Sequence, residues 1–382
     1  MRNIHFDAVY HMPWLEYRHA TPEGKVVLRL QTGRGDFSRI IAKVTSNYNY
    51  PDYFANATQV EMKVAYRDEF HDWYECVFTP EDVRVKYLFI LESDEQVFKL
   101  DAAGLHFGRD YYEDISESFA FAYAYAAPAM PEWAKGCVGY QIFPDRFRRE
   151  GENEPGLEPW TSDRVQNEFR YGGNLRGIIK AVPYLKELGV EMVYSTPMFL
   201  SDSSHRYNTF DYFQIDPLLG TEDDLRELCD ELHKNGMKLI MDLVPNHTSD
   251  QHRWFIESRK SKDNPYSDFY YWFDEPPFDW QACFGGSAWE YDETTGEYYL
   301  HQYSIKMPDL NWEYEPLRRE IYKMLNWWLD FGVDGFRLDV ADELADTFLD
   351  EFRRAVKNEN SDSVVIGEVW EDASDKVSYG RR

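Results

Sequence analysis

The sequence has few cysteines and no long apolar run. Its four cysteines lie far apart, with no C-x-x-C pair and no metal-ligand spacing, so neither a disulfide framework nor a zinc site is expected. No stretch approaches the roughly 20 apolar residues that cross a bilayer, and the N-terminus lacks the apolar segment of a secretion signal. These absences predict reduced thiols and a cytoplasmic location.

Basic residues are scarce relative to acidic ones. The 41 basic and 69 acidic residues give a formal net charge of −28, spread along the chain without acidic runs. This charge argues against nucleic acid or an anionic membrane as partner and favours a neutral ligand. Aromatic residues make up 17% of the chain, which suits stacking on sugar rings, although large cores use them as well.

Residues 1–120 have the pattern of an antiparallel β-sandwich. Short segments rich in Val, Tyr, Phe and Thr are separated by turns that contain Gly, Asp, Asn and Pro. The expected strands are 26–30, 39–44, 62–65, 73–78, 83–91 and 96–100. Residues 121–135 contain small residues and prolines and are expected to form a linker.

Residues 136–382 follow a different pattern, in which a helix, a glycine and a strand succeed one another. Helical stripes of apolar residues end at Gly189, Gly236 and Gly332, each of which precedes a short apolar strand. The expected strands are 138–143, 190–196, 238–243, 333–339 and 364–369. Repeated strand–helix units predict a parallel sheet with right-handed crossovers. Residues 248–312 interrupt this pattern and are expected to form a small inserted subdomain that covers a pocket.

Polar residues gather where these strands end, and parallel strands carry their reactive groups at that edge. The candidates, in chain order, are His205, Tyr207, Asp242, Asn246, His247, Arg337, Asp339 and Glu368. Each has a structural explanation by itself: Arg337 beside Asp339 is also the pattern of an ion pair, and His247 that of a hydrogen-bonded loop histidine. Clusters at four consecutive strand ends nevertheless predict a shared pocket, with Asp242 and Asn246 in structural roles.

Two carboxyl groups on neighbouring strands, with an arginine and two histidines but no metal-ligand spacing, suit glycoside cleavage. A carboxylate beside Arg337 is expected to stay ionised at neutral pH and to attack an anomeric carbon. A second carboxyl group in a drier environment would keep its proton and give it to the leaving oxygen. The histidines can hydrogen-bond sugar hydroxyls, and Tyr207 can stack on a sugar ring.

Three motifs resemble signature regions of the α-amylase superfamily, glycoside hydrolase family 13: D-L-V-P-N-H (242–247), G-F-R-L-D-V-A-D-E (335–343) and G-E-V-W (367–370). Three more point to its neopullulanase, cyclomaltodextrinase and maltogenic amylase branch: Y-Q-I-F-P-D-R-F (140–147), H-R-Y-N-T-F-D-Y-F (205–213) and M-P-D-L-N (307–311). The resemblance implies a starch-binding-type N-terminal domain followed by a (β/α)8 TIM barrel, of which about five strands are present.

The resemblance also implies roles for the candidate residues. Asp339 corresponds to the nucleophile and Glu368 to the general acid/base, with Arg337 orienting Asp339 and keeping it ionised. Both histidines would bind hydroxyls of the sugar at the cleavage point, and Tyr207 would stack beneath it. The implied mechanism is retaining, through a glycosyl-enzyme ester, with the two carboxyl groups about 5–5.5 Å apart.

The chain departs from the family pattern at several positions. The family's His-Asp pair after the seventh strand has no counterpart before Arg382, so the sequence is expected to be C-terminally truncated. The segments 148–155 and 172–174 lack the Asp and Asn pattern of a calcium loop; no cofactor is therefore expected to be required, although calcium is not ruled out. Asn208 stands where the branch usually has Asp, and Trp312 resembles the oligo-1,6-glucosidases.

The leading hypothesis is an α-glucan hydrolase that resembles neopullulanases and cyclomaltodextrinases. Cyclodextrins, maltooligosaccharides, and pullulan or starch fragments with α-1,6 bonds all remain open as substrates. One alternative is a transglycosylase on the same substrates, which would differ in how well the pocket excludes water. Another is a non-catalytic glucan-binding protein. The presence of both acidic residues argues against this alternative. The resemblance also suggests a homodimer through the N-terminal domain.

Overall fold

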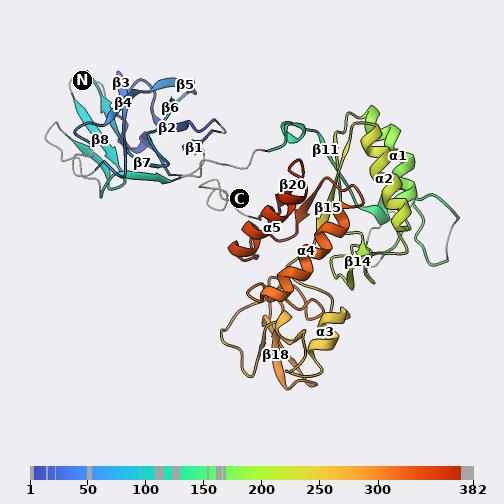
Figure 1. Ribbon diagram of the computed structural model, residues 1–382. Helices are drawn as coiled ribbons and strands as arrows, with labels where there is room; N and C mark the ends of the chain where they lie inside the picture. Colours follow the sequence, from blue (N-terminus) through green and yellow to red (C-terminus); the bar gives the residue numbers. More distant parts are fainter. Residues whose placement is uncertain are drawn as a thin grey trace. The chain divides into compact units, whose positions relative to one another are not determined.

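The computed structural model describes residues 4–13, 16–21, 23–49, 54–94, 96–107, 116–122, 130–152, 155–160, 166 and 169–370. The chain divides into two compact units, one preceding Met130 and the other spanning Met130–Trp370. Figure 1 draws the strands of the first unit in blue to cyan and the second unit in green to red.

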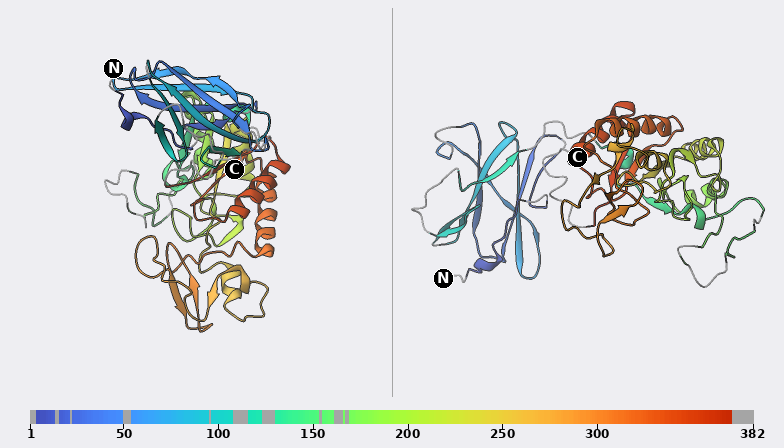
Figure 2. Two further views of the ribbon diagram at one scale, coloured as in Figure 1. Left: turned by 90° about the vertical axis from the view of Figure 1, so that its left-hand side faces the viewer. Right: turned by 90° about the horizontal axis from the view of Figure 1, so that it is seen from below.

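Two antiparallel sheets build the first unit (Figures 1 and 2). One sheet has the order β1-β2-β6-β5, from β1 (Arg18–Ala20), β2 (Val26–Gly33), β5 (Lys63–Arg67) and β6 (His71–Phe78). The other has the order β4-β3-β7-β8-β9, with β10 also paired to β7; it comprises β3 (Arg39–Ser46), β4 (Thr58–Glu61), β7 (Arg84–Glu92), β8 (Val97–Asp101), β9 (Gly104–Phe107) and β10 (Phe119–Ala122). A short 3-10 helix, η1 (Phe6–Ala8), precedes them.

The core of this unit lies between the two sheets. Leu28 and Leu30 of β2 belong to the same buried cluster as Ile40 and Phe89 of the second sheet. The predicted antiparallel β-sandwich is therefore confirmed. Strand β10 runs two residues into the segment assigned to the linker, because Phe119 and Phe121 alternate into the core and pair with β7.

A five-stranded parallel sheet with the order β11-β12-β15-β19-β20 forms the centre of the second unit. Its strands are β11 (Gly139–Ile142), β12 (Met192–Ser195), β15 (Lys238–Leu243), β19 (Gly335–Leu338) and β20 (Val364–Gly367). Its helices are α1 (Leu175–Glu187), α2 (Glu222–Lys234), α4 (Glu315–Leu329) and α5 (Asp346–Glu359). Helices α1 and α2 lie side by side, as do α4 and α5 (Figure 1). The predicted five parallel strands of a partial barrel are confirmed.

Local sequence signals set the ends of these helices. Gly189, Gly236 and Gly332 follow α1, α2 and α4 with φ angles of +82°, +79° and +98°, a region that glycine enters without steric cost. At the other end of α2, Thr221 and Asp224 form a capping box, in which each side chain accepts a hydrogen bond from the other's backbone N–H.

The remaining elements of this unit surround the parallel sheet. Two 3-10 helices, η2 (Glu132–Ala134) and η3 (Pro144–Arg146), flank β11, and the antiparallel pair β13 (Phe199–Leu200) and β14 (Asp211–Ile215) follows β12. The predicted insertion after the third parallel strand has its own structure, comprising α3 (Arg253–Ser258), η4 (Ser267–Phe269), β16 (Trp272–Phe273), β17 (Trp289–Asp292) and β18 (Glu297–Leu300). The last three form a small antiparallel sheet.

Two expectations from composition can be compared with the fold. None of the helices in the described ranges is both long enough and apolar enough to cross a bilayer. The four cysteines form no disulfide: Cys76 and Cys229 are buried, Cys137 is half-buried and Cys283 is exposed.

Candidate active site

The carboxyl ends of β15, β19 and β20 bring the predicted charged residues together. Asp242 in β15 pairs in register with Arg337 in β19, and Asp339 follows β19 directly. Glu368 follows β20, and its backbone N–H donates to the carbonyl of Leu338 at 2.9 Å. Because these three strands are neighbours in a parallel sheet, their ends share one edge.

Arg337 lies at the centre of this cluster. Its Nη1 is 2.9 Å from Asp242 Oδ2 and 2.9 Å from Asp339 Oδ1, and its Nη2 is 2.6 Å from Glu368 Oε1. One guanidinium group therefore binds three carboxyl groups. If all three were ionised the cluster would carry a net negative charge, which a largely buried site disfavours.

Burial raises the pKa of Asp339 to about 8, the neighbouring Asp242 adds to this rise, and Arg337 opposes it. Burial therefore works against the ionisation of Asp339 that Arg337 was expected to favour. The physical reason is that one cation shared among three carboxyl groups does not offset the loss of hydration at Asp339.

The expected difference in hydration between the two carboxyl groups is also reversed. The side chain of Glu368 is 29% exposed, whereas that of Asp339 is 10% exposed.

Val340, directly after Asp339, has an unusual backbone conformation. Its φ angle is +43°, which β-branched residues rarely adopt, at a typical cost of about 1–3 kcal/mol. In this conformation the Val340 N–H donates to Glu368 Oε2 at 3.0 Å. The strained turn thus links the chain after Asp339 to the Glu368 carboxyl group.

Asp242 is a fully buried support of the cluster. It accepts hydrogen bonds from the hydroxyls of Tyr194 and Tyr207, the latter at 3.1 Å, in addition to its contact with Arg337. Burial raises the pKa of Asp242 to about 6, against the lowering effect of Arg337 and the two hydroxyls. These contacts agree with the structural role predicted for Asp242.

His205 and Tyr207 face each other on the loop between β13 and β14, with their rings stacked at a centroid distance of 5.9 Å. The Tyr207 N–H donates to His205 Nδ1 at 3.1 Å, so in the neutral ring the proton is on Nε2. Burial lowers the pKa of His205, and the adjacent Arg206 lowers it further. The imidazole is therefore a neutral hydrogen-bond donor.

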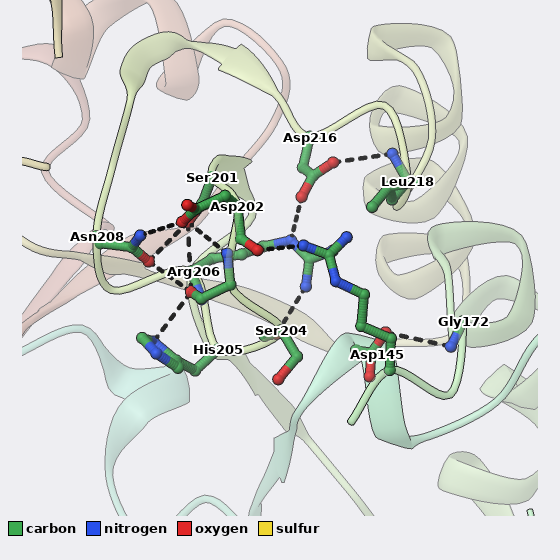
Figure 3. A network of polar contacts seen from close by, with 12 residues as sticks. Asp145, Gly172, Ser201, Asp202, Ser204, His205, Arg206, Asn208, Asp216 and Leu218 are labelled. Carbon is green, nitrogen blue, oxygen red and sulfur yellow. Dashed lines mark hydrogen bonds and ion pairs between the residues drawn. The ribbon is translucent and has the colours of Figure 1, made fainter. Parts of the chain in front are cut away.

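Arg206, which lies between these two residues in the chain, is a feature that sequence reasoning missed (Figure 3). Its φ angle is +64°, and its side chain is 1% exposed. Its Nε lies 2.6 Å from Asp216 Oδ2, and its Nη1 donates to the Ser204 carbonyl at 2.8 Å. The position of Arg206 inside the H-R-Y-N-T motif could have indicated it, but no sequence signal identified Asp216 as its partner.

Asn208 stands where the family branch usually has Asp, and its hydrogen bonds explain this difference (Figure 3). Asn208 Oδ1 accepts a hydrogen bond from Ser201 Oγ at 2.7 Å, while its Nδ2 donates to Asp202 Oδ1 at 2.5 Å. An aspartate at this position would lack the donor and would place a second carboxylate against Asp202. Asparagine is therefore the residue that fits this loop.

His247 and Asn246, after β15, form the side of the cluster that faces the inserted subdomain. Burial lowers the pKa of His247 to about 4, so this histidine is neutral as well. Its ring lies 5.6 Å from that of Tyr303, which sequence reasoning also missed. Asn246 Nδ2 donates to Asp309 Oδ1 at 3.2 Å, which ties the D-L-V-P-N-H and M-P-D-L-N motifs together.

In the degenerate calcium loop, Asn174 and Glu150 are hydrogen-bonded within the protein. Asn174 Oδ1 accepts from the Gly177 N–H at 2.8 Å as the N-cap of α1, and Asn174 Nδ2 donates to the Glu150 carbonyl at 2.8 Å. Asn174 Oδ1 and the Glu150 carbonyl oxygen thus each accept a hydrogen bond from the protein. In the first unit, Asp101 lies close to a histidine and a glutamate, but Lys99 Nζ, 2.6 Å away, already supplies the positive charge.

The sequence matches two α-amylase domain families. The α-amylase catalytic domain matches residues 141–381, and the α-amylase N-terminal Ig-like domain matches residues 4–125. The match to the catalytic domain covers the parallel sheet from the second half of β11 onwards and all the residues of the cluster described above.

Similar proteins include several glycosidases. Neopullulanase 2 of Thermoactinomyces vulgaris is 34% identical over 377 residues, which are 96% of this chain and 61% of that protein. The oligo-1,6-glucosidase of Heyndrickxia coagulans is 48% identical over 227 residues, 58% of this chain and 38% of that protein. A solved cyclomaltodextrinase structure has a TM-score of 0.79 at 30% identity, covering 98% of this chain and 62% of that one.

The neopullulanase and the cyclomaltodextrinase match nearly the whole of this chain, but this chain spans only about three fifths of their length. Within that span both domain matches, the order of the domains and the fold agree with one another. The chain therefore belongs to the α-amylase family, with an N-terminal Ig-like domain followed by an α-amylase catalytic domain.

Proposed function

We propose that this protein hydrolyses α-glucosidic bonds in α-glucans with retention of anomeric configuration. Asp339 is the nucleophile that forms the glycosyl-enzyme ester, and Glu368 is the acid that protonates the leaving oxygen and then the base that activates water. Arg337 orients both carboxyl groups. The family's third carboxylate, the aspartate of its His-Asp pair, would lie outside the described residues, and its presence would not change these two roles.

The observation that carries the proposal is the contact of Asp339 and Glu368 with one guanidinium group. Nη1 of Arg337 holds Asp339 and Nη2 holds Glu368, so both carboxyl groups lie at one site. Two carboxyl groups held by one cation support the close pairing, about 5–5.5 Å, that retaining glycosidases need, whereas inverting ones need room for a water molecule between the carboxyl groups.

The surroundings of the two acids support a neutral sugar as the substrate. His205 and His247 are neutral because burial lowers the pKa of each, so they can exchange hydrogen bonds with hydroxyl groups. The stacked ring of Tyr207 offers an aromatic face beside them. Arg337, which holds the two acids, is already bound to carboxyl groups and so is not a free partner for a charged substrate.

We propose that α-1,6 bonds are among those cleaved. The identity of 48% to an enzyme named oligo-1,6-glucosidase is confined to 227 residues, whereas the identity to the neopullulanase extends over 377 residues at 34%. Hydrolysis rates on isomaltotriose, maltotriose and pullulan would rank the linkages directly.

The experiment that tests the proposal uses Asp339→Asn and Glu368→Gln, with Asp330→Asn at the exposed end of α4 as the matched control. We expect each of the first two changes to lower kcat/KM on the order of 10³-fold or more, and the control to leave it unchanged. Turnover retained by Asp339→Asn would remove the nucleophile assignment.

NMR of the first product formed tests retention separately. An α-anomer supports the paired-carboxyl mechanism, and a β-anomer contradicts it. The same experiment with excess glucose or maltose as acceptor distinguishes a hydrolase from a transglycosylase by the appearance of longer products. Binding of glucans without any turnover would favour the non-catalytic alternative.

We also propose a cytoplasmic location and a homodimer through the first unit. The exposed Cys283 thiol is compatible with a reducing compartment. Exposed apolar side chains on the edge strand β5, Val64 and Tyr66, are compatible with an interface. Cell fractionation tests the location, and light scattering tests the dimer.

A further inference from the structure

Tyr194 on β12 lies beside the catalytic cluster and takes no part in the chemistry proposed above. It pairs in register with Ile240 of β15, so its side chain lies on the same face of the sheet as that of Asp242, two residues further along β15. Asp242 in turn pairs with Arg337 of β19. The side chains of Tyr194, Asp242 and Arg337 therefore form a row across three neighbouring strands, and this row ends next to Asp339.

Tyr194 contacts both other members of this row. Its hydroxyl group donates a hydrogen bond to Asp242 Oδ2, and Arg337 Cζ lies 5.7 Å from the centre of its ring. A guanidinium group within about 6 Å of an aromatic ring is attracted to it. Burial raises the pKa of Tyr194 well above its usual range, and the neighbouring Asp242 adds to this rise. The hydroxyl group therefore keeps its proton and remains a donor to Asp242 at neutral pH.

Asp242 and Asp339 share one nitrogen atom of Arg337. Arg337 Nη1 lies 2.9 Å from Asp242 Oδ2 and 2.9 Å from Asp339 Oδ1, and it makes a second contact with Asp242, to Oδ1, at 3.1 Å. An ionised Asp242 therefore draws on the same positive charge as Asp339 and repels a second negative charge there. Protonation of Asp242 would leave Nη1 to Asp339.

The other titratable and charged groups around the two aspartates include Tyr194, Tyr207, Tyr212, Tyr303, Arg337 and Glu368. The four tyrosines keep their protons because burial raises the pKa of each, and the guanidinium group stays charged. Both histidines of the site are already neutral, because burial lowers the pKa of each. The charge of this cluster therefore changes with pH through its carboxyl groups.

We propose that Tyr194 is a positioning residue that, through Asp242, sets how much of the Arg337 charge is available to Asp339. A hydrogen bond donated to a carboxylate favours its ionised form, so the Tyr194 hydroxyl stabilises the charge of Asp242. An ionised Asp242 holds Arg337 Nη1 and hinders the ionisation of Asp339. The role of Asp339 as nucleophile rests on the function proposed above, whereas the contacts that lead from Tyr194 to Asp339 do not.

The test is Tyr194→Phe, which removes only the hydroxyl group. Without this donor Asp242 protonates more readily, so Asp339 is freed from a repelling charge and from the competition for Arg337 Nη1. We expect the acid limb of the pH profile of kcat/KM, measured on maltotriose, to move to lower pH by about half a pH unit or more. A loss of packing alone would lower kcat/KM at every pH and leave the limb in place.

The matched control is Tyr322→Phe, because the Tyr322 hydroxyl also donates to a carboxyl group, Glu351 Oε2 at 2.9 Å, but between α4 and α5. Its pH profile should coincide with that of the unchanged protein. A second variant, Asp242→Asn, removes the charge that Tyr194 stabilises. In that background Tyr194→Phe should shift the acid limb no further. No shift in Tyr194→Phe, or an equal shift in both backgrounds, would overturn the inference.

Carbon-13 NMR of protein labelled at the aspartate carboxyl carbons measures the same effect without catalysis. The Asp339 signal is identified by its loss in Asp339→Asn. Its titration midpoint should be lower in Tyr194→Phe than in the unchanged protein, and equal in Asp242→Asn with and without Tyr194→Phe. A lowered midpoint in a protein that hydrolyses no glucan would support the inference and refute the proposed function. An unchanged midpoint would refute the inference and leave the proposed function standing.

Discussion

At the scale of single residues, the protonation of Asp339 depends on burial more than on the arginine beside it. Sequence reasoning weighed the adjacent Arg337 and predicted an ionised carboxylate. In the structure, Arg337 also binds Asp242 and Glu368, and the pKa of Asp339 rises to about 8 because of burial. Substrate binding or a further charged group would have to shift this equilibrium before the nucleophile can act at neutral pH.

A pH-dependent stability follows from this shift. Because the folded pKa of Asp339 is raised from its model-compound value of 3.8 to about 8, the folded state holds the proton more tightly. Its contribution to stability is full below about pH 4 and is lost as the pH rises towards 8. We therefore expect Asp339→Asn, relative to the unchanged protein, to gain at least about 1.4 kcal/mol of unfolding free energy between pH 5 and pH 8, the equivalent of one pKa unit.

Urea unfolding at the two pH values measures this difference. Asp330→Asn, at the exposed end of α4, serves as the control and should show no gain. If the unfolding free energies of Asp339→Asn and of the unchanged protein changed equally between the two pH values, burial would not govern the pKa of Asp339.

The buried pair of Arg206 and Asp216 gives a second prediction. Asp216→Asn leaves the guanidinium buried without its counter-charge, which typically costs about 3–5 kcal/mol. Because Arg206 lies between His205 and Tyr207, we also expect a raised KM for glucans with a smaller change in kcat.

The matched control for Asp216→Asn is the exposed pair of Arg319 and Glu315 on α4. There, Arg319→Met should lower the free energy of unfolding by less than about 0.5 kcal/mol. The double variant Arg206→Met with Asp216→Leu should recover part of the stability lost in the single variant. Equal losses in the buried and exposed pairs, measured by thermal unfolding, would contradict the positioning role.

At the scale of elements, β19 and β20 must approach closely to bring their acidic residues together. A Cβ atom on Gly335 would lie 2.2 Å from the Val364 carbonyl oxygen on β20. We therefore expect Gly335→Ala to displace β20, and with it Glu368, so that both kcat/KM and thermal stability fall.

Gly332→Ala is the control for this prediction, because it changes a glycine of the same segment outside the strand. Its φ of +98° should cost about 1–2 kcal/mol of stability. The approach of the two strands is unaffected, so kcat/KM should be retained. If Gly335→Ala kept full activity, the close contact of β19 and β20 would not be what positions Glu368.

At the scale of the whole molecule, the net charge of −28 opposes self-association unless salt screens it. Strand β5 is the edge of its sheet, and all five of its residues are exposed. If this edge forms the proposed dimer, Tyr66→Lys should shift light-scattering mass from dimer to monomer at 0.15 M salt.

Tyr48→Lys is the control for the dimer experiment, since Tyr48 is 62% exposed and Tyr66 is 63% exposed. It should leave the mass unchanged. Deletion of residues 1–120 should abolish association as well, and a monomeric mass for the unchanged protein would refute the proposal.

The sequence by itself determined the order of elements and the place of the chemistry. Helices that end in glycine and are followed by apolar strands require a parallel sheet, and parallel strands end at a common edge. Asp242, Arg337, Asp339 and Glu368 therefore had to meet, and they do. These signals are local, so they could be read from neighbouring residues.

The tertiary structure decided what depends on residues far apart in the chain. The protonation of Asp339 and the exposure of Glu368 depend on burial, and the partner of Arg206 lies ten residues further along the chain. The position of Tyr303 against His247 joins the inserted subdomain to the end of β15. Hydration and pairing are properties of the folded packing, and no local pattern in the sequence encodes them.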